Sequence, residues 1–209
     1  MRMMFDMLSA DYLNAALIVN SYDDWTDRWH HEPDSSVSGS SLKDVIANLH
    51  RANFELWHWE DSTRDVHAGD AAIAAAKRAI DRMNQRRNDL IEQCDTLLLE
   101  ALAAQNLPNP QAELHSETPG LMLDRLSILT LKRYHTIEEM NRATAPATHR
   151  ERNSHRLAII EKQRDDLAGC LTRLGQRVLH GELRFQIYRQ LKMYNDPELN
   201  PVLYRHSDA

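Results

Sequence analysis

Apolar residues recur every three or four positions along four long stretches of the chain, and this spacing constrains the fold more than any other feature. In the stretch from 42 to 63, Val45, Leu49, Ala52 and Leu56 fall on one side of a helix. The other stretches cover 71–104, 120–142 and 149–180. Only 6 glycines occur in 209 residues, which favours helices over sheets. We therefore predict an all-α fold, an antiparallel bundle of four long helices.

The two ends of the chain show weaker patterns. Residues 9–20 predict a short N-terminal helix, and residues 21–41 predict a long irregular segment. A shorter helix is expected over 182–194. The tail that follows contains Pro197 and Pro201 and is expected to be extended, lying along the bundle through Val202, Leu203 and Tyr204. Nothing in this pattern requires a second domain, so residues 1–209 are expected to form one.

Composition excludes several classes of protein. No run of about 18 apolar residues occurs, so no membrane span is expected, and Asp6 and Asp11 interrupt any signal peptide. The two cysteines, Cys94 and Cys170, fall on apolar helix faces, which favours reduced thiols and a cytoplasmic protein. A net charge of −6 gives no general attraction to nucleic acid. Nucleic acid is therefore not expected as a partner.

Polar side chains interrupt the apolar faces of the predicted helices. Because a carboxylate on an apolar face needs a partner, Glu60 is expected to meet a cation such as Arg87. Such groups could form a ligand site between helices, or an ion-pair network that only fixes their register. The candidate ligand-binding residues are Asn53, Glu60, Asn84, Arg87, Asp124, Arg125, Lys132, His135 and Arg164.

Searches for catalytic and metal motifs give little. Glu55 and His58 have the Glu-x-x-His spacing of di-iron bundles, but both project away from the apolar face and no second copy occurs. His30 and His31 follow two tryptophans in the segment expected to be irregular, where packing is the favoured interpretation. His135 projects to the same side as Asp124 and is the better candidate for acid–base work. No phosphate loop or nucleophile motif is present. We therefore expect no metal and no cofactor, and no common enzyme class is supported.

Three segments resemble an uncharacterised bacterial family, the domain-of-unknown-function family 4254. They are LHRANFELWHWEDSTR (49–64), AIDRMNQRRNDLIEQCD (79–95) and ETPGLMLDRLSILTLKRYH (117–135). The resemblance spans most of the chain and implies a helical fold, with no established reaction. It further implies an association with cell-surface glycans, and hence a nucleotide-sugar or glycan-precursor ligand. In that setting Arg87, Arg125 and Lys132 would meet phosphate, and Asn53, Asn84 or Glu60 would meet hydroxyls.

Two functions remain open from the sequence. The first is binding of a small anionic or sugar-like ligand at an inter-helix polar site, which we favour because separate helices break their apolar patterns with complementary polar groups. The second is a scaffold or protein-interaction module whose buried polar network is purely structural. An exposed apolar face would also permit a homodimer.

Overall fold

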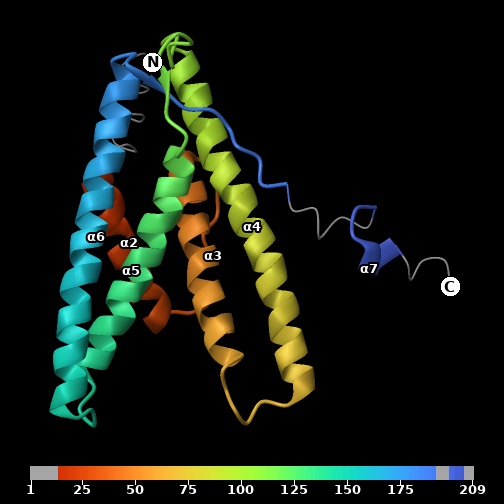
Figure 1. Cartoon of the computed structure of the whole chain (residues 1–209), viewed down its shortest axis with the longest axis vertical. Coiled ribbons are helices and arrows are strands. Elements are labelled where there is room, and N and C mark those ends of the chain that lie inside the picture. Colours follow the sequence, from red (N-terminus) through yellow and green to blue (C-terminus); the bar gives the residue numbers. More distant parts are fainter. Residues whose placement is uncertain (1–13, 192–197, 205–209) are drawn as a thin grey trace.

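The structure is a computed structural model that describes residues 14–191 and 198–204, and it confirms the all-α prediction. Figure 1 shows the long helices and how the chain connects them. The described elements are α2 (Ala15–His31), α3 (Leu42–Ser62), α4 (Asp70–Ala103), β1 (Glu113–Leu114), α5 (Pro119–Asn141), α6 (Ala147–Leu179), β2 (Leu183–Arg184) and α7 (Pro201–Tyr204).

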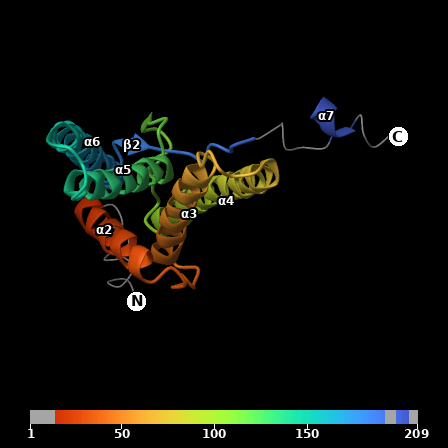
Figure 2. The same ribbon diagram turned by 90° about the horizontal axis from the view of Figure 1, so that it is seen from below.

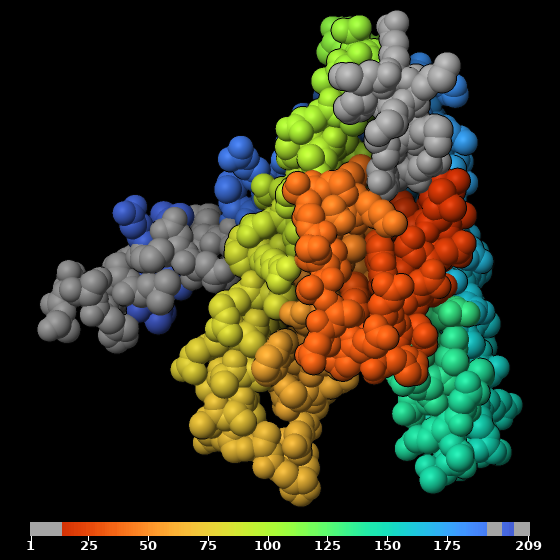
Figure 3. Space-filling model, turned by 180° about the vertical axis from the view of Figure 1, so that it is seen from behind, coloured from red at the N-terminus to blue at the C-terminus, as the bar shows by residue number. Residues whose placement is uncertain are grey.

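Two helical hairpins, α3–α4 and α5–α6, form the frame of the molecule. Their turns lie at the same end, and the hairpins diverge toward it (Figure 1). Seen from below, α2 lies on one side of both hairpins and spans the distance between them (Figure 2). The space-filling view from behind shows a wide notch between the two turns, beyond the end of α2 (Figure 3). The arrangement therefore separates the hairpins at one end and joins them through α2 and the core at the other.

The core lies where the hairpins and α2 converge. Leu49, Leu98, Leu126 and Leu171, one from each long hairpin helix, are at most 1% exposed and belong to a single apolar cluster. Tyr22 adds a fully buried ring from α2 to that cluster. Burying such side chains supplies the main driving force for packing the helices.

Capping side chains mark the beginnings of α3 and α5, whereas Gly69 and Pro146 precede α4 and α6 without a side-chain cap. Ser41 accepts a hydrogen bond from the backbone N–H of Asp44, whose carboxylate accepts one from the backbone N–H of Ser41 in return. Thr118 caps α5 through the N–H of Leu121, and Pro119 occupies its first turn. The four predicted long helices therefore begin and end within two residues of their observed limits.

Several predictions at the ends of the chain are wrong. The segment expected to be irregular continues α2 to His31, because Ile18, Tyr22 and Trp29 recur at helical spacing and all are buried. Residues 9–13 lie outside the described part. No helix covers 182–191, where β2 and an extended segment follow α6, and 192–194 are not described. Pro201–Tyr204 forms one helical turn, with Val202 exposed, instead of an extended strand laid on the bundle. Cys94 is buried as expected, but Cys170 is exposed.

The two short strands β1 and β2 form a parallel pair at the end of the molecule opposite the two hairpin turns (Figure 1). Glu113 and Leu114 pair with Leu183 and Arg184, and the N–H of His115 donates to the carbonyl of Arg184 over 2.8 Å. This pairing connects the loop before α5 to the segment after α6. No helix within residues 14–191 or 198–204 has the length and apolarity needed to cross a membrane.

Candidate functional site

An ion pair between α4 and α5 lies at the centre of the candidate site. Arg87 donates from Nε to Oδ1 of Asp124 over 2.7 Å and from Nη2 to Oδ2 over 2.5 Å. Asp124 is buried, whereas Arg87 is partly accessible. These hydrogen bonds raise the pKa of Arg87, although burial acts against them. The carboxylate is therefore held in a fixed orientation by a two-point contact.

The amide of Asn53 extends this ion pair to α3. Its Nδ2 donates to Oδ1 of Asp124 over 2.9 Å and to Oγ of Ser127 over 3.0 Å. Both protons of the amide nitrogen are thereby used. Since Asn53 and Ser127 are buried, each needs such partners to offset the cost of leaving water.

His50 continues the network toward α2. Its Nδ1 lies 2.7 Å from Oγ of Ser127, and its Nε2 lies 2.8 Å from Oγ1 of Thr26 and 3.1 Å from the carbonyl of Tyr22. Thr26 donates its own proton to the Tyr22 carbonyl, so Nε2 of His50 must be the donor to both oxygens. Nδ1 then accepts from Ser127. One assignment of protons thus satisfies the whole chain of contacts.

The ring of His50 is neutral in the folded protein. It is fully buried, and burial lowers its pKa to about 3, although the hydrogen bond to the Tyr22 carbonyl acts in the opposite direction. Tyr22 stacks on this ring at 4.4 Å between centroids, and burial raises the pKa of the tyrosine. The network therefore contains one charged pair, Arg87 with Asp124, and neutral groups behind it.

A groove of about 280 Å³ opens beside the ion pair, between α3, α4 and α5. Asn53 and Arg87 belong to its wall, so the polar network reaches solvent there. The remaining lining residues are Leu56, Trp57, Glu60, Asp61, Arg64, Asn84, Ile128 and Leu131.

Two further hollows lie next to this groove, as the lining residues that they share with it indicate. One of about 440 Å³ shares Trp57 and also contains Lys132, His135 and Arg156. The other, of about 610 Å³ between α5 and α6, shares Ile128 and contains Arg125. Lys132 lines both of these hollows. We use the name inter-hairpin groove for the set of three hollows; both hairpins line those of 280 Å³ and 440 Å³, and the α5–α6 hairpin lines the third.

The structure brings together three of the predicted residues through direct contacts, namely Asn53, Arg87 and Asp124. Asn84 and Glu60 line the same groove. The expectation that Glu60 is buried and meets Arg87 is wrong. Its side chain is about half exposed and pairs with Arg64 one turn later, because Glu60 lies in the last turn of α3, where Trp59 and Asp61 are also exposed.

The other predicted residues lie apart from the ion pair. Arg125 pairs with Glu117 near the start of α5, and Arg164 pairs with Asp23 of α2. His135 does not face Asp124. Residue 135 is about three turns further along α5 than residue 124, and its Nδ1 lies 2.7 Å from Glu138 instead.

Sequence patterns did not indicate His50, Ser127 or Thr26 as part of the site. A signal for His50 exists, because it is spaced four residues from both Ile46 and Phe54, which are buried. A polar residue at such a position predicts a buried hydrogen bond. Thr26 lies in the segment predicted to be irregular, residues 21–41, so the sequence pattern assigns it no helix face.

Comparisons with known proteins add a family and no activity. No curated protein and no solved structure matches the chain. A family model described as a protein of unknown function, DUF4254, matches residues 43–187, which include all nine predicted site residues and the whole of α4, α5 and α6. The chain belongs to this family of proteins of unknown function.

Proposed function

We propose that the protein binds a small anionic, hydroxyl-bearing ligand in the inter-hairpin groove. The observation that carries this proposal is the presence of cations without carboxylate partners in a hollow. Among the described residues, the ammonium of Lys132 has no hydrogen bond or ion pair, and Arg156 contacts only the side chain of Asn153. Both line the 440 Å³ hollow. A phosphate or carboxylate there would satisfy both.

Arg87 supports the same interpretation from the neighbouring hollow. Its contact with Asp124 uses Nε and Nη2, which leaves Nη1 with no partner in the described part of the chain. Because Asp124 holds the guanidinium in place, Nη1 would donate to a ligand with little loss of side-chain entropy. The groove therefore presents one oriented cation and two exposed cations without a carboxylate partner among the described residues.

Amide and carboxylate groups in the groove would suit hydroxyls. Asn84 and Glu60 line the 280 Å³ hollow beside Arg87, and Gln163 lines the two others. Trp57 adds an apolar surface where two of the hollows meet. Such a mixture of aromatic surface and convergent polar groups is typical of small-molecule sites, and phosphorylated sugars or nucleotide sugars would offer these groups both hydroxyls and an anion.

A second candidate is a scaffold or protein-interaction module. The observation that favours it is the complete hydrogen bonding of the network from Asp124 through Asn53 and Ser127 to His50. Such a network stabilises one register of the helices without any ligand. In that case the inter-hairpin groove would not bind small molecules.

Titration calorimetry and thermal unfolding with sugar phosphates, nucleotides and nucleotide sugars distinguish the two. We expect saturable stabilisation by one of these classes. Lys132→Ala and Arg156→Ala should each weaken that binding by about 10-fold or more, because each removes a charge-assisted hydrogen bond. Lys43→Ala, at an exposed position outside the groove, is the matched control and should bind normally. Absence of binding by every class of compound would reject the ligand proposal and leave the scaffold.

A further inference from the structure

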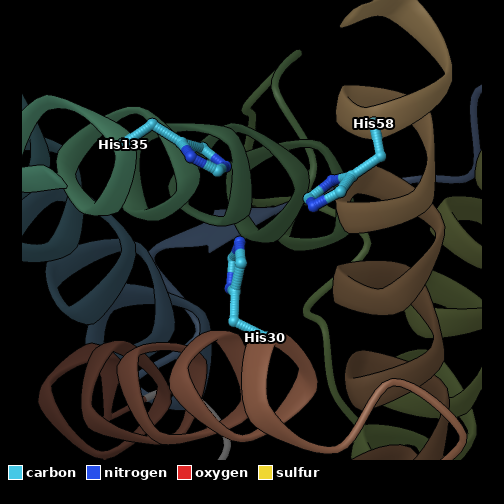
Figure 4. A group of neighbouring side chains, drawn as sticks. All are labelled: His30, His58 and His135. Atoms are coloured by element: carbon cyan, nitrogen blue, oxygen red, sulfur yellow. The ribbon is translucent and has the colours of Figure 1, made fainter. Parts of the chain in front are cut away.

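We propose that His30, His58 and His135 form a binding site for a divalent transition-metal ion such as Zn²⁺. The three residues come from α2, α3 and α5, and their rings point toward a common centre (Figure 4). Their possible ligand atoms all lie within 4.8 Å of one another, and no other set of three or more His, Cys, Asp or Glu in the described ranges meets this condition. Spacing along the chain does not predict the group, because three separate helices supply it.

The first argument concerns the proton on each ring. In all three histidines Nδ1 faces a hydrogen-bond acceptor, so Nδ1 carries the proton and Nε2 keeps its lone pair. The acceptors are the carbonyl of Thr26 at 2.7 Å, the carbonyl of Phe54 at 3.0 Å and the carboxylate of Glu138 at 2.7 Å. Histidine ligands of metals are held in this way, with the second nitrogen bonded to a carbonyl or carboxylate.

The second argument concerns the nitrogens that remain. Nε2 of His30 and Nε2 of His135 are buried and have no hydrogen-bond partner among the described residues. Burying an acceptor without a partner costs free energy, so such atoms call for an explanation. A metal ion at the centre of the group would coordinate both lone pairs. His58 is exposed, so solvent and ions can reach this centre.

The third argument is the arrangement of the rings. A zinc ion binds imidazole nitrogen at about 2.0–2.1 Å, and at tetrahedral angles this places the centres of three coordinating rings about 5 Å apart. The observed distances between ring centroids are 5.2 Å for His30 and His135, 5.3 Å for His30 and His58, and 5.8 Å for His58 and His135. The planes are inclined to one another by 48° to 70°, so no two of the three rings are stacked face to face.

Neighbouring aromatic rings support the histidines from outside. Tyr134 stacks on His30 with 4.1 Å between the ring centroids, and Trp57 stacks on His135 with 4.7 Å between theirs. Phe54 lies 4.4 Å from His58. This support limits rotation of the rings and holds the three nitrogens close together before an ion arrives.

An ion held by these three residues would have neutral imidazoles as its protein ligands, since neutral imidazole is the form that coordinates metals. Three protein ligands leave one tetrahedral position for water, and an ion with that coordination can polarise a bound water or substrate oxygen. Since His135 and Trp57 also line the inter-hairpin groove, the metal site would adjoin it.

Metal titration of the full chain tests this proposal. Protein freed of purification tags and treated with a chelator would be titrated with Zn²⁺ by calorimetry, and with Co²⁺ by visible absorption. We expect one ion per chain, an increase in melting temperature, and the intense Co²⁺ spectrum of a tetrahedral site. His58→Ala should weaken Zn²⁺ binding by about 100-fold or more, and Glu138→Gln by about 10-fold, because outer partners alone change affinity by 10–100-fold.

His31→Ala is the matched control. His31 is also on α2, and its Nδ1 bonds to the carbonyl of Asp27 as that of His30 bonds to Thr26, but it lies outside the group. His58 is exposed, so its replacement should leave the fold intact, as circular dichroism would confirm. Failure of the chelated protein to bind Zn²⁺, or equal affinities for the His58→Ala and His31→Ala variants, would overturn the proposal. Neither result would bear on the groove, whose test uses Lys132 and Arg156.

Discussion

Asp124 accepts two hydrogen bonds from Arg87, and this contact joins α4 of one hairpin to α5 of the other. The carboxylate is buried, so its charge depends on the guanidinium for compensation. Arg87→Ala should therefore lower the free energy of unfolding by about 3–5 kcal/mol, because it leaves an unpaired charge in the interior. Chemical denaturation of the two proteins measures the difference.

The control for this prediction is the exposed pair of Glu60 with Arg64. Both side chains are about half exposed or more, so Arg64→Ala should change stability by less than about 1 kcal/mol. A double variant, Arg87→Leu with Asp124→Leu, should be more stable than Arg87→Ala alone, since no buried charge remains. Equal losses from Arg87→Ala and Arg64→Ala would show that the ion pair has no special role.

Gly120 permits α4 and α5 to approach closely. A Cβ at this position would lie 2.5 Å from the carbonyl oxygen of Ile91 and 3.0 Å from the carboxylate of Asp95. The carbonyl belongs to the backbone of α4 and cannot rotate away. Gly120→Ala should therefore destabilise the protein by about 1–3 kcal/mol, as overpacking does. Thermal and urea unfolding would measure this loss.

The same substitution at Gly169 should increase the stability of the protein, in contrast to Gly120→Ala. A Cβ there would meet only the end of the Arg173 side chain, at 3.1 Å, and that side chain can move. Alanine is the better helix former within α6, so Gly169→Ala should stabilise by about 0.5–1 kcal/mol. Similar effects at the two glycines would show that the contact between α4 and α5 is looser than described.

The sequence predicts individual helices better than their mutual contacts. Periodicity predicts α3 to α6, and projection onto the apolar faces indicates Asn53 and Arg87, whereas for Asp124 it leaves open whether the side chain lines a polar cleft or faces water. Projection treats a helix as if the core continued along its length, so it places Glu60 inside although the side chains of residues 58–61 are all exposed. For His58, projection considers only the helix on which the residue lies, α3. The neighbours of His58 on α2 and α5 follow from packing between distant segments, which one helix cannot reveal.

The buried ring of His50 should make stability depend on pH. Its pKa is about 3 when folded, below the ordinary value of 6.5 for an exposed histidine, so between these values the unfolded chain binds more protons. The contribution of His50 is therefore fully present above about pH 6.5 and is lost as the pH falls toward 3. The loss between pH 6.5 and 5 should be about 2 kcal/mol.

Denaturation curves at several pH values would check this slope. His50→Gln should reduce the slope of unfolding free energy against pH between about 4 and 6.5, even though the substitution also lowers stability overall. His155→Gln, at an exposed position on α6, should leave the slope unchanged. A slope that is the same in all three proteins would place the acid sensitivity elsewhere.

The titration of Asp95 should lower the stability of the protein as the pH rises between about 4 and 6, whereas that of His50 raises it. Its Oδ1 accepts the backbone N–H of Gly120 over 2.7 Å, but burial raises its pKa to about 6, and bonds from Thr118 and Gly120 only partly offset that effect. The folded protein then binds more protons between pH 4 and 6, so the stability contributed by Asp95 falls as the pH rises through this window.

Asp95→Asn keeps an oxygen for Gly120 and removes the buried charge. Relative to the unmodified protein, the variant should therefore become more stable by about 2 kcal/mol between pH 4 and 7. Paired urea titrations at the two pH values measure this change, and the contribution of His50 cancels because both proteins retain it. A constant difference between them would mean that Asp95 keeps an ordinary pKa in the folded state.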